Sequence, residues 1–183
     1  YGMVLVTMMV VRTEDDIKKL VWVVAMSLGF YGLKGGIFTI ASGGTSHVFG
    51  PEDSYITDNN ALALALITVT PILCYLQMNA SKRILRWGYL GLIALTLAAA
   101  VGSYSRGGLL AGAAMLGFLW LKSRAKLRTG IALALVAPLV YMVMPDKWFG
   151  RMETIDDYQT DASAQGRINA WNFAWNVAQQ HPF

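Results

Sequence analysis

Charged side chains are scarce in this sequence. Asp, Glu, Lys and Arg make up only 14% of its 183 residues, whereas hydrophobic residues make up 55%. Soluble domains carry about 25% charged residues, and the mean hydropathy of this chain is +0.45. The composition therefore argues against a soluble domain with a single core.

Cysteine and internal repetition are also lacking. The single cysteine, Cys74, lies within an apolar stretch. It has no partner with which to form a disulfide or a thiolate metal site. The sequence contains no repeat of fixed period and no low-complexity tract. We therefore predict one integral-membrane domain over residues 1–183.

Long apolar runs are what the sequence has instead. The run from Leu20 to Phe38 is long enough to cross a bilayer, but it contains Lys34, Gly35 and Gly36, so we expect a broken helix there. Residues 2–11 have the pattern of the end of a further helix. Four more runs extend from Ala61 to Met78, Trp87 to Ser103, Gly107 to Leu121 and Gly130 to Met144.

These runs predict an all-α fold, a polytopic transmembrane helical bundle with about five complete transmembrane helices and part of another. The chain opens on Tyr1 without an initiator Met and stops at Phe183 directly after a helical pattern. We therefore expect a fragment that is truncated at both ends.

Lys and Arg are distributed unevenly between the loops. Ten of the fifteen lie in alternate loops, namely Arg12, Lys18, Lys19, Lys82, Arg83, Arg86, Lys122, Arg124, Lys126 and Arg128. The opposite loops carry eight of the eleven carboxylates. By the positive-inside rule the basic loops are cytoplasmic, and residues 145–183 begin a large extracytoplasmic loop. The net charge of +4 then reflects orientation in the membrane and gives no support for nucleic-acid binding.

Arg106 is the first candidate functional residue. It lies at the tip of a predicted transmembrane hairpin, and the following run of 15 residues covers roughly 22 Å of a ~30 Å hydrocarbon core. Arg106 is therefore expected below the outer surface, where a guanidinium needs an anion or carbonyl groups. Gly107 and Gly108 would let a ligand approach the backbone. The alternative is that Arg106 snorkels to outer-leaflet phosphates.

Arg167 is the second candidate. Residues 161–166 have a turn-like composition, and residues 167–180 have the spacing of an amphipathic interfacial helix. Arg167 would then lie in the first turn, where a cation opposes the helix dipole unless a negative group such as a phosphate binds there. The alternative is a solvated arginine beside Asp157 and Asp161, on a helix that tryptophans anchor among the lipid headgroups.

Three further side chains each have two interpretations. Arg151 could bind an anion or pair with Glu153 or Asp146. Lys34 could bind an anion or snorkel. Asp58 could accept a proton from a hydroxyl group, but its position before an alanine-rich helix is also typical of an N-cap.

The order of several motifs resembles the O-antigen ligase and polymerase superfamily. These motifs are Gly102-Ser103-Tyr104-Ser105-Arg106-Gly107-Gly108, Trp120-Leu121-Lys122-Ser123-Arg124 and Gly166-Arg167-Ile168-Asn169-Ala170-Trp171 before His181-Pro182. Others are most similar to exosortase-associated O-glycosylation ligases, namely Phe30-Tyr31-Gly32-Leu33-Lys34-Gly35-Gly36, Gly50-Pro51 and Asp58-Asn59-Asn60.

The resemblance implies an inverting, metal-independent glycosyltransferase of the bacterial inner membrane, with its active site facing the periplasm. Such an enzyme transfers a glycan from an undecaprenyl-diphosphate carrier to a hydroxyl of an acceptor lipid, glycan or protein. No metal or cofactor is implied, and the outer loops contain no Asp-Xaa-Asp pair. Arg106 and Arg167 would bind the diphosphate and stabilise the charge on the leaving group, with Arg151 as a further candidate.

The resemblance also leaves questions open. The family has a histidine in the large outer loop, which we expect beyond Phe183 and do not assign to His181. Asp58 is one substitute for the unidentified general base. The chain could instead be a polysaccharide polymerase that joins lipid-linked repeats. A non-enzymatic alternative is a transporter or flippase in which Lys34, Arg106 and the expected broken helix line a path for an anionic lipid or solute.

Overall fold

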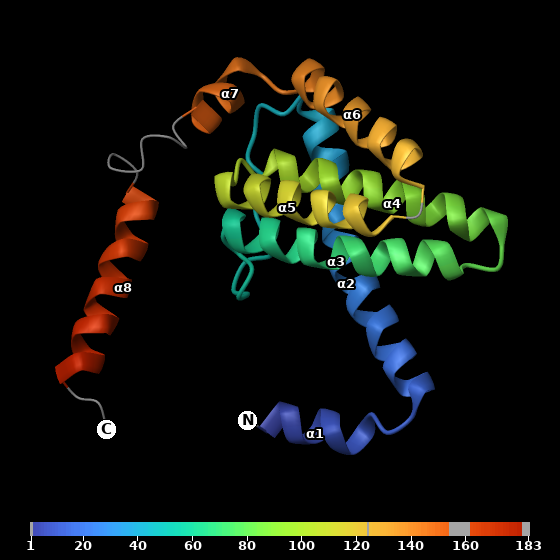
Figure 1. Cartoon of the computed structure of the whole chain (residues 1–183), viewed down its shortest axis with the longest axis horizontal. Helices are drawn as coiled ribbons and strands as arrows, with labels where there is room; N and C mark the ends of the chain where they lie inside the picture. The colour runs from blue at the N-terminus through green and yellow to red at the C-terminus, as the bar shows by residue number, and fades with distance from the viewer. Residues whose placement is uncertain (1, 124, 154–161, 181–183) are drawn as a thin grey trace. The chain divides into compact units, whose positions relative to one another are not determined.

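Helices are the only regular elements in the part of the chain that this computed structural model describes, residues 2–123, 125–153 and 162–180 (Figure 1). The helices are α1 (Gly2–Val10), α2 (Glu14–Ala41), α3 (Asn59–Asn79), α4 (Arg83–Gly102), α5 (Arg106–Lys122), α6 (Lys126–Val143), α7 (Asp146–Glu153) and α8 (Ala162–Gln180). The chain divides into two compact units, Tyr1–Pro145 and Asp146–Phe183.

The predicted apolar runs coincide with helices α2 to α6. Among the described residues, α2, α3 and α4 are long and apolar enough to cross a membrane. Helices α5 and α6 correspond to the other two predicted spans and have 17 and 18 residues. The prediction of an all-α membrane bundle is confirmed, and the number of spans stays a prediction.

Helix α2 corrects one expectation, because it continues without a break through Lys34, Gly35 and Gly36. The glycines serve close packing instead. A Cβ atom at Gly36 would lie 2.2 Å from the backbone oxygen of Leu95, and one at Gly32 would lie 2.3 Å from the hydroxyl of Thr96. Small residues at such positions let two membrane helices approach each other closely. The glycines that led us to expect a break are instead the residues at which α2 contacts α4.

The contacts between α2 and α4 advance in the same direction along both helices. Gly29 of α2 faces Leu92 of α4, and Gly35 faces Ala99. The two helices therefore run parallel. Helix α3 runs the other way, and Figure 1 shows α3, α4 and α5 side by side. The buried core of this unit lies between α2, α3 and α4 and includes Ala25, Leu62, Leu66, Val69, Leu73 and Ala99.

This topology gives the first unit two chemically different ends. We call one the turn end; it contains the α2–α3 loop, residues 42–58, and the α4–α5 turn, residues 103–105. We call the other the basic end. It contains residues 12–19, which lead into α2 and form its start, and residues 79–86, which run from the last residue of α3 into the first turn of α4.

The second unit contains one helix that the sequence analysis missed and one that it placed incorrectly. Helix α7 was not predicted, and Trp148 and Met152, one turn apart on it, are buried. Helix α8 begins at Ala162, not at Arg167. The prediction that Arg167 lies in the first turn was wrong, because residues 162–166 are helical. The electrostatic conflict inferred at that position therefore does not arise.

Candidate functional site

The α4–α5 turn is a buried and tightly held segment. Ser103 and Tyr104 are fully buried, and Ser105 is 3% exposed. Tyr104 adopts a positive φ of 58°, an uncommon conformation for a residue other than glycine. Its hydroxyl donates a hydrogen bond to the backbone oxygen of Gly44, 60 residues earlier in the chain. Burial raises the pKa of the Tyr104 phenol.

The loop after α2 is attached to this turn at a second point. The backbone N–H of Val48 donates to the oxygen of Gly102 at 3.0 Å. Between the two attachments, the ring of His47 lies against the ring of Tyr104, with 4.2 Å between their centroids. No sequence motif marked His47 as a candidate functional residue. His47 lies in a loop whose conformation includes positive φ values at Gly43 and Gly44. No sequence pattern predicted this loop conformation.

The start of α3 is attached to the same turn by two side chains. Asn59 donates from its amide nitrogen to the backbone oxygen of Ser103 at 2.7 Å, and this bond is buried. The hydroxyl of Ser105 donates to the amide oxygen of Asn60 at 2.7 Å. Two motifs that the sequence analysis quoted separately, residues 58–60 and 102–108, are thus in direct contact.

Asp58 is the N-cap of α3. Its carboxylate accepts hydrogen bonds from the backbone N–H groups of Asn60 and Ala61 at 2.8 and 3.3 Å. This confirms the capping interpretation of Asp58. A catalytic role for its carboxylate stays a prediction.

Arg106 is the first residue of α5 and is partly exposed. Ser105 caps this helix, because its hydroxyl accepts a hydrogen bond from the N–H of Gly108 at 3.0 Å. A Cβ at Gly108 would lie 2.7 Å from that of Ala63, so α5 packs closely on α3 there. A Cβ at Gly107 would meet nothing within 4 Å. The first turn of α5 is therefore firmly supported on one side and open beside Arg106.

The start of α5 suits an anion. The N-termini of α3 and α5 are held together by the bond between Ser105 and Asn60. The start of α5 carries a partial positive charge and N–H groups that point out of the helix. At the start of α3, the carboxylate of Asp58 already accepts two such N–H groups. The guanidinium of Arg106 adds a full positive charge and several donors. A phosphate or diphosphate group is the type of ligand that such donors bind most strongly.

The other predicted site residues lie elsewhere. Lys34 is exposed, and its neighbours Phe30 and Ile37 are 58% and 54% exposed, so it lies on the face of α2 away from α4. Arg151 is exposed on α7, and Arg167 is exposed on α8. Both belong to the second unit.

Several residues in the earlier interpretations lie outside the described residues, namely Asp157, Asp161 and His181. Within the part of the chain that is described, no group of three or more His, Cys, Asp or Glu side chains could hold a metal ion.

Comparison with known families fits these motifs. A family model described as O-antigen ligase matches residues 90–183, which is more than half of the chain. The chain belongs to the O-antigen ligase family. In this member of the family, the matched segment includes Arg106, Arg151 and Arg167. A second model, of a family of unknown function, matches residues 2–81 and includes Lys34 and Asp58. No curated protein and no solved structure matches the chain.

Family membership has two consequences. As an O-antigen ligase family member, the chain has a glycosyltransferase-like enzyme function of the glycan-transfer or ligase type. Its apolar helices make it a multi-pass membrane protein. The hydrogen bonds from Asn59 to Ser103 and from Ser105 to Asn60 also join the segments that the two models match separately. Residues 59–60 of one segment and 103–105 of the other are therefore in direct contact at the turn end. The closer similarity to exosortase-associated ligases stays a prediction.

Proposed function

We propose that this protein is an inverting, metal-independent glycosyltransferase that moves a glycan from an undecaprenyl-diphosphate carrier to an acceptor hydroxyl. The observation that carries the proposal is the turn end itself. There, two helix N-termini are hydrogen-bonded together and Arg106 occupies the first position of α5, beside the open backbone of Gly107. This arrangement supports diphosphate binding, and the family supports glycan transfer.

The proposed reaction is a single displacement. The acceptor hydroxyl oxygen attacks the anomeric carbon from the face opposite the diphosphate. A new C–O bond forms, and the bond from the anomeric carbon to the diphosphate oxygen breaks with its electron pair. Negative charge therefore grows on the diphosphate as the reaction proceeds. Fixed cationic donors lower the barrier because they bind that charge more strongly in the transition state than in the ground state.

Arg106 and Arg167 are the residues to which we assign this role. Two guanidinium groups can neutralise a diphosphate without a divalent ion, and their planar donors match phosphate oxygens in pairs. Arg151 and Lys34 are secondary candidates for contact with the substrate. The active site would face the periplasm, because the basic end carries the charges that favour the cytoplasm.

Asp58 is a candidate acceptor for the hydroxyl proton, and its capping role makes the test specific. Asparagine caps a helix as well as aspartate does but is not a base. If Asp58 accepts the proton, Asp58→Asn should lower the transfer rate by about 10²- to 10⁴-fold while the melting temperature stays the same. An unchanged rate would leave Asp58 as a structural cap only.

The polymerase alternative uses the same displacement with a second lipid-linked repeat as the acceptor, so the product distinguishes it from a ligase. One argument for the transporter alternative was the expected broken helix, and it no longer holds because α2 is continuous through Lys34. Helix α2 thus offers no unwound segment of the type that lines transport sites.

The proposal can be tested with the full-length protein in proteoliposomes that contain an undecaprenyl-diphosphate glycan and candidate acceptors, in EDTA. We expect release of undecaprenyl diphosphate, with labelled glycan on the acceptor. Arg106→Ala and Arg167→Ala should each lower the rate by about 10²- to 10³-fold, as the loss of one transition-state donor does in other enzymes.

Arg83→Ala is the matched control, because Arg83 is also the first residue of a membrane helix but lies at the basic end. It should leave the rate unchanged. Transfer that survives in Arg106→Ala, or that requires a divalent ion, would contradict the proposal. Movement of the lipid across the bilayer without transfer would favour the transporter.

A further inference from the structure

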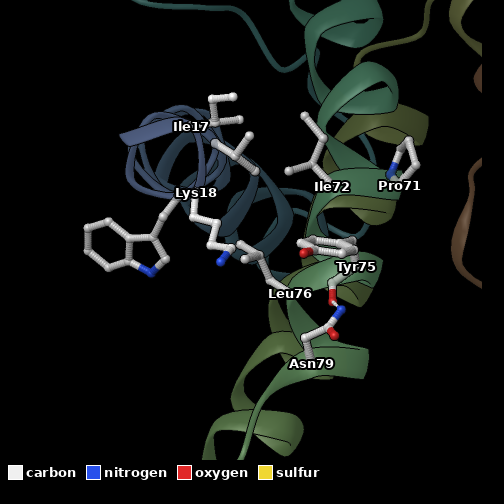
Figure 2. A pocket seen from close by; sticks show the side chains of 9 residues that line it. Ile17, Lys18, Pro71, Ile72, Tyr75, Leu76 and Asn79 are labelled. Atoms are coloured by element: carbon white, nitrogen blue, oxygen red, sulfur yellow. Dashed lines mark hydrogen bonds between the residues drawn. The ribbon is translucent and has the colours of Figure 1, made fainter. Parts of the chain in front are cut away.

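An open groove runs between α2 and α3 at the basic end, and it is separate from the turn end described above (Figure 2). Its volume is about 670 Å³, within the range of about 300–1,000 Å³ that is usual for small-molecule sites. Its walls are mostly aliphatic and include Val21 of α2 with Ile72 and Leu76 of α3. Water is a poor solvent for such walls, so the groove suits a hydrocarbon chain.

Two aromatic residues mark the level of this groove in a membrane. Trp22 of α2 is 50% exposed and Tyr75 of α3 is 52% exposed, and both line the groove. Tryptophan and tyrosine favour the boundary between hydrocarbon and lipid headgroups. The groove therefore begins near headgroup level and continues along apolar side chains.

Basic and polar groups lie at the headgroup end of the groove. In Figure 2 the side chain of Lys18 extends from α2 toward α3, and Asn79 lies at the end of α3. Arg86 of α4 donates to the backbone oxygen of Met78 at 3.3 Å, which holds a second cation at the end of α3, although Arg86 does not line the groove. The amine of Lys18 also contacts Asp15 at 3.3 Å. Both side chains of that pair are largely exposed, and such a pair is weak enough to exchange for another anion.

We propose that the groove binds an anionic phospholipid, with one acyl chain along the aliphatic walls and the phosphate beside Lys18. Among the described residues that line the groove, the one charged side chain is the cation Lys18. An anionic headgroup can pair with this cation, whereas the same groove of a second copy would bring a second Lys18 toward it. Basic pockets between membrane helices on the cytoplasmic side are a known means of binding anionic headgroups. The inference does not depend on the proposed function, because it concerns the opposite end of the helices.

Native mass spectrometry of the full-length protein in detergent, titrated with phosphatidylglycerol or phosphatidylcholine, tests the proposal. We expect tighter binding of phosphatidylglycerol. Lys18→Gln should weaken that binding about fivefold, the usual contribution of one basic residue near an anionic surface, and should leave phosphatidylcholine unaffected. Ile17→Trp places a larger side chain at a half-exposed position on the groove wall. It should weaken the binding of both lipids.

Lys19→Gln is the matched control. Lys19 is the next residue along the chain, carries the same charge and pairs with Asp16 at 3.8 Å, but it does not line the groove. It should leave lipid binding unchanged. Equal weakening by Lys18→Gln and Lys19→Gln would show general attraction to the surface and overturn the site. Equal affinity for both lipids would also overturn it. So would a dimer of the wild type that Ile17→Trp dissociates, because the groove would then bind a second copy of the chain.

Discussion

The turn end and the basic end of the first unit are held together by different forces. At the turn end, buried side chains of Asn59, Tyr104 and Ser105 bridge segments that are distant in the sequence. At the basic end, the charged pairs lie within one helix and are exposed, and an open groove separates α2 from α3. A buried polar bond fixes a geometry, because breaking it leaves an unsatisfied group. An open apolar groove fixes no such geometry and only limits the size and polarity of the ligands that fit it.

This difference suggests how the two ends are used. Arg106 belongs to the rigid end, where small displacements of a charged donor would weaken its interaction with a developing charge. The open end has no comparable requirement, and it fits a lipid that exchanges with the bilayer. The difference can be tested by matched substitutions at the two ends.

The largest effect on stability is expected in the close contact between α2 and α4. Gly36→Ala places a Cβ against the backbone oxygen of Leu95, which cannot move away without separating the helices. We expect a loss of about 1–3 kcal/mol in the free energy of unfolding. Gly91→Ala, on α4, is the control, since a Cβ there meets nothing within 4 Å. Thermal unfolding in detergent measures both, and equal stability of the two variants would contradict the close packing.

The next effect concerns buried and exposed amides. Asn59→Ala leaves the buried oxygen of Ser103 without its donor, and the expected loss is about 1–3 kcal/mol. Asn79→Ala removes an exposed bond to the oxygen of Tyr75 at the basic end and should change stability by less than about 0.5 kcal/mol. The same unfolding experiment compares them. If Asn79→Ala destabilised the protein as much as Asn59→Ala, the distinction between the two ends would not hold.

The smallest effects are expected for a cap and an exposed ion pair. Ser105→Ala removes the N-cap of α5 and the bond to Asn60 and should cost about 1 kcal/mol. Lys19→Ala removes the pair with Asp16 and should cost no more than about 0.5 kcal/mol. Chemical denaturation followed by tryptophan fluorescence can resolve these values. A larger loss from Lys19→Ala than from Ser105→Ala would reverse the comparison.

Much of the fold could be predicted from the sequence because membrane helices have a simple physical signature. An apolar run of sufficient length has to satisfy its backbone hydrogen bonds internally, which only a helix does within one segment. The runs from Ala61 to Met78 and from Trp87 to Ser103 accordingly became α3 and α4. The N-cap at Asp58 was also predictable, because capping is a local interaction.

The rest depended on contacts between distant segments, which local patterns do not report. Gly35 and Gly36 were interpreted as a break, because a single sequence does not show that α4 packs against them. The contact of His47 with Tyr104 depends in the same way on the loop conformation. The start of α8 was misplaced because the composition of residues 162–166 resembles a turn, although these residues continue the helix.

The most direct test of this account is the affinity of the full-length protein for undecaprenyl diphosphate, measured in detergent for the wild type, Arg106→Ala and Arg83→Ala. If the turn end holds the diphosphate, Arg106→Ala should weaken binding by at least about tenfold, as expected for a lost charge-assisted hydrogen bond of ~1.5–3 kcal/mol. Arg83→Ala, at the basic end, should leave the affinity unchanged. Unchanged affinity in Arg106→Ala, or an equal loss in Arg83→Ala, would contradict the assignment of the diphosphate site to the turn end.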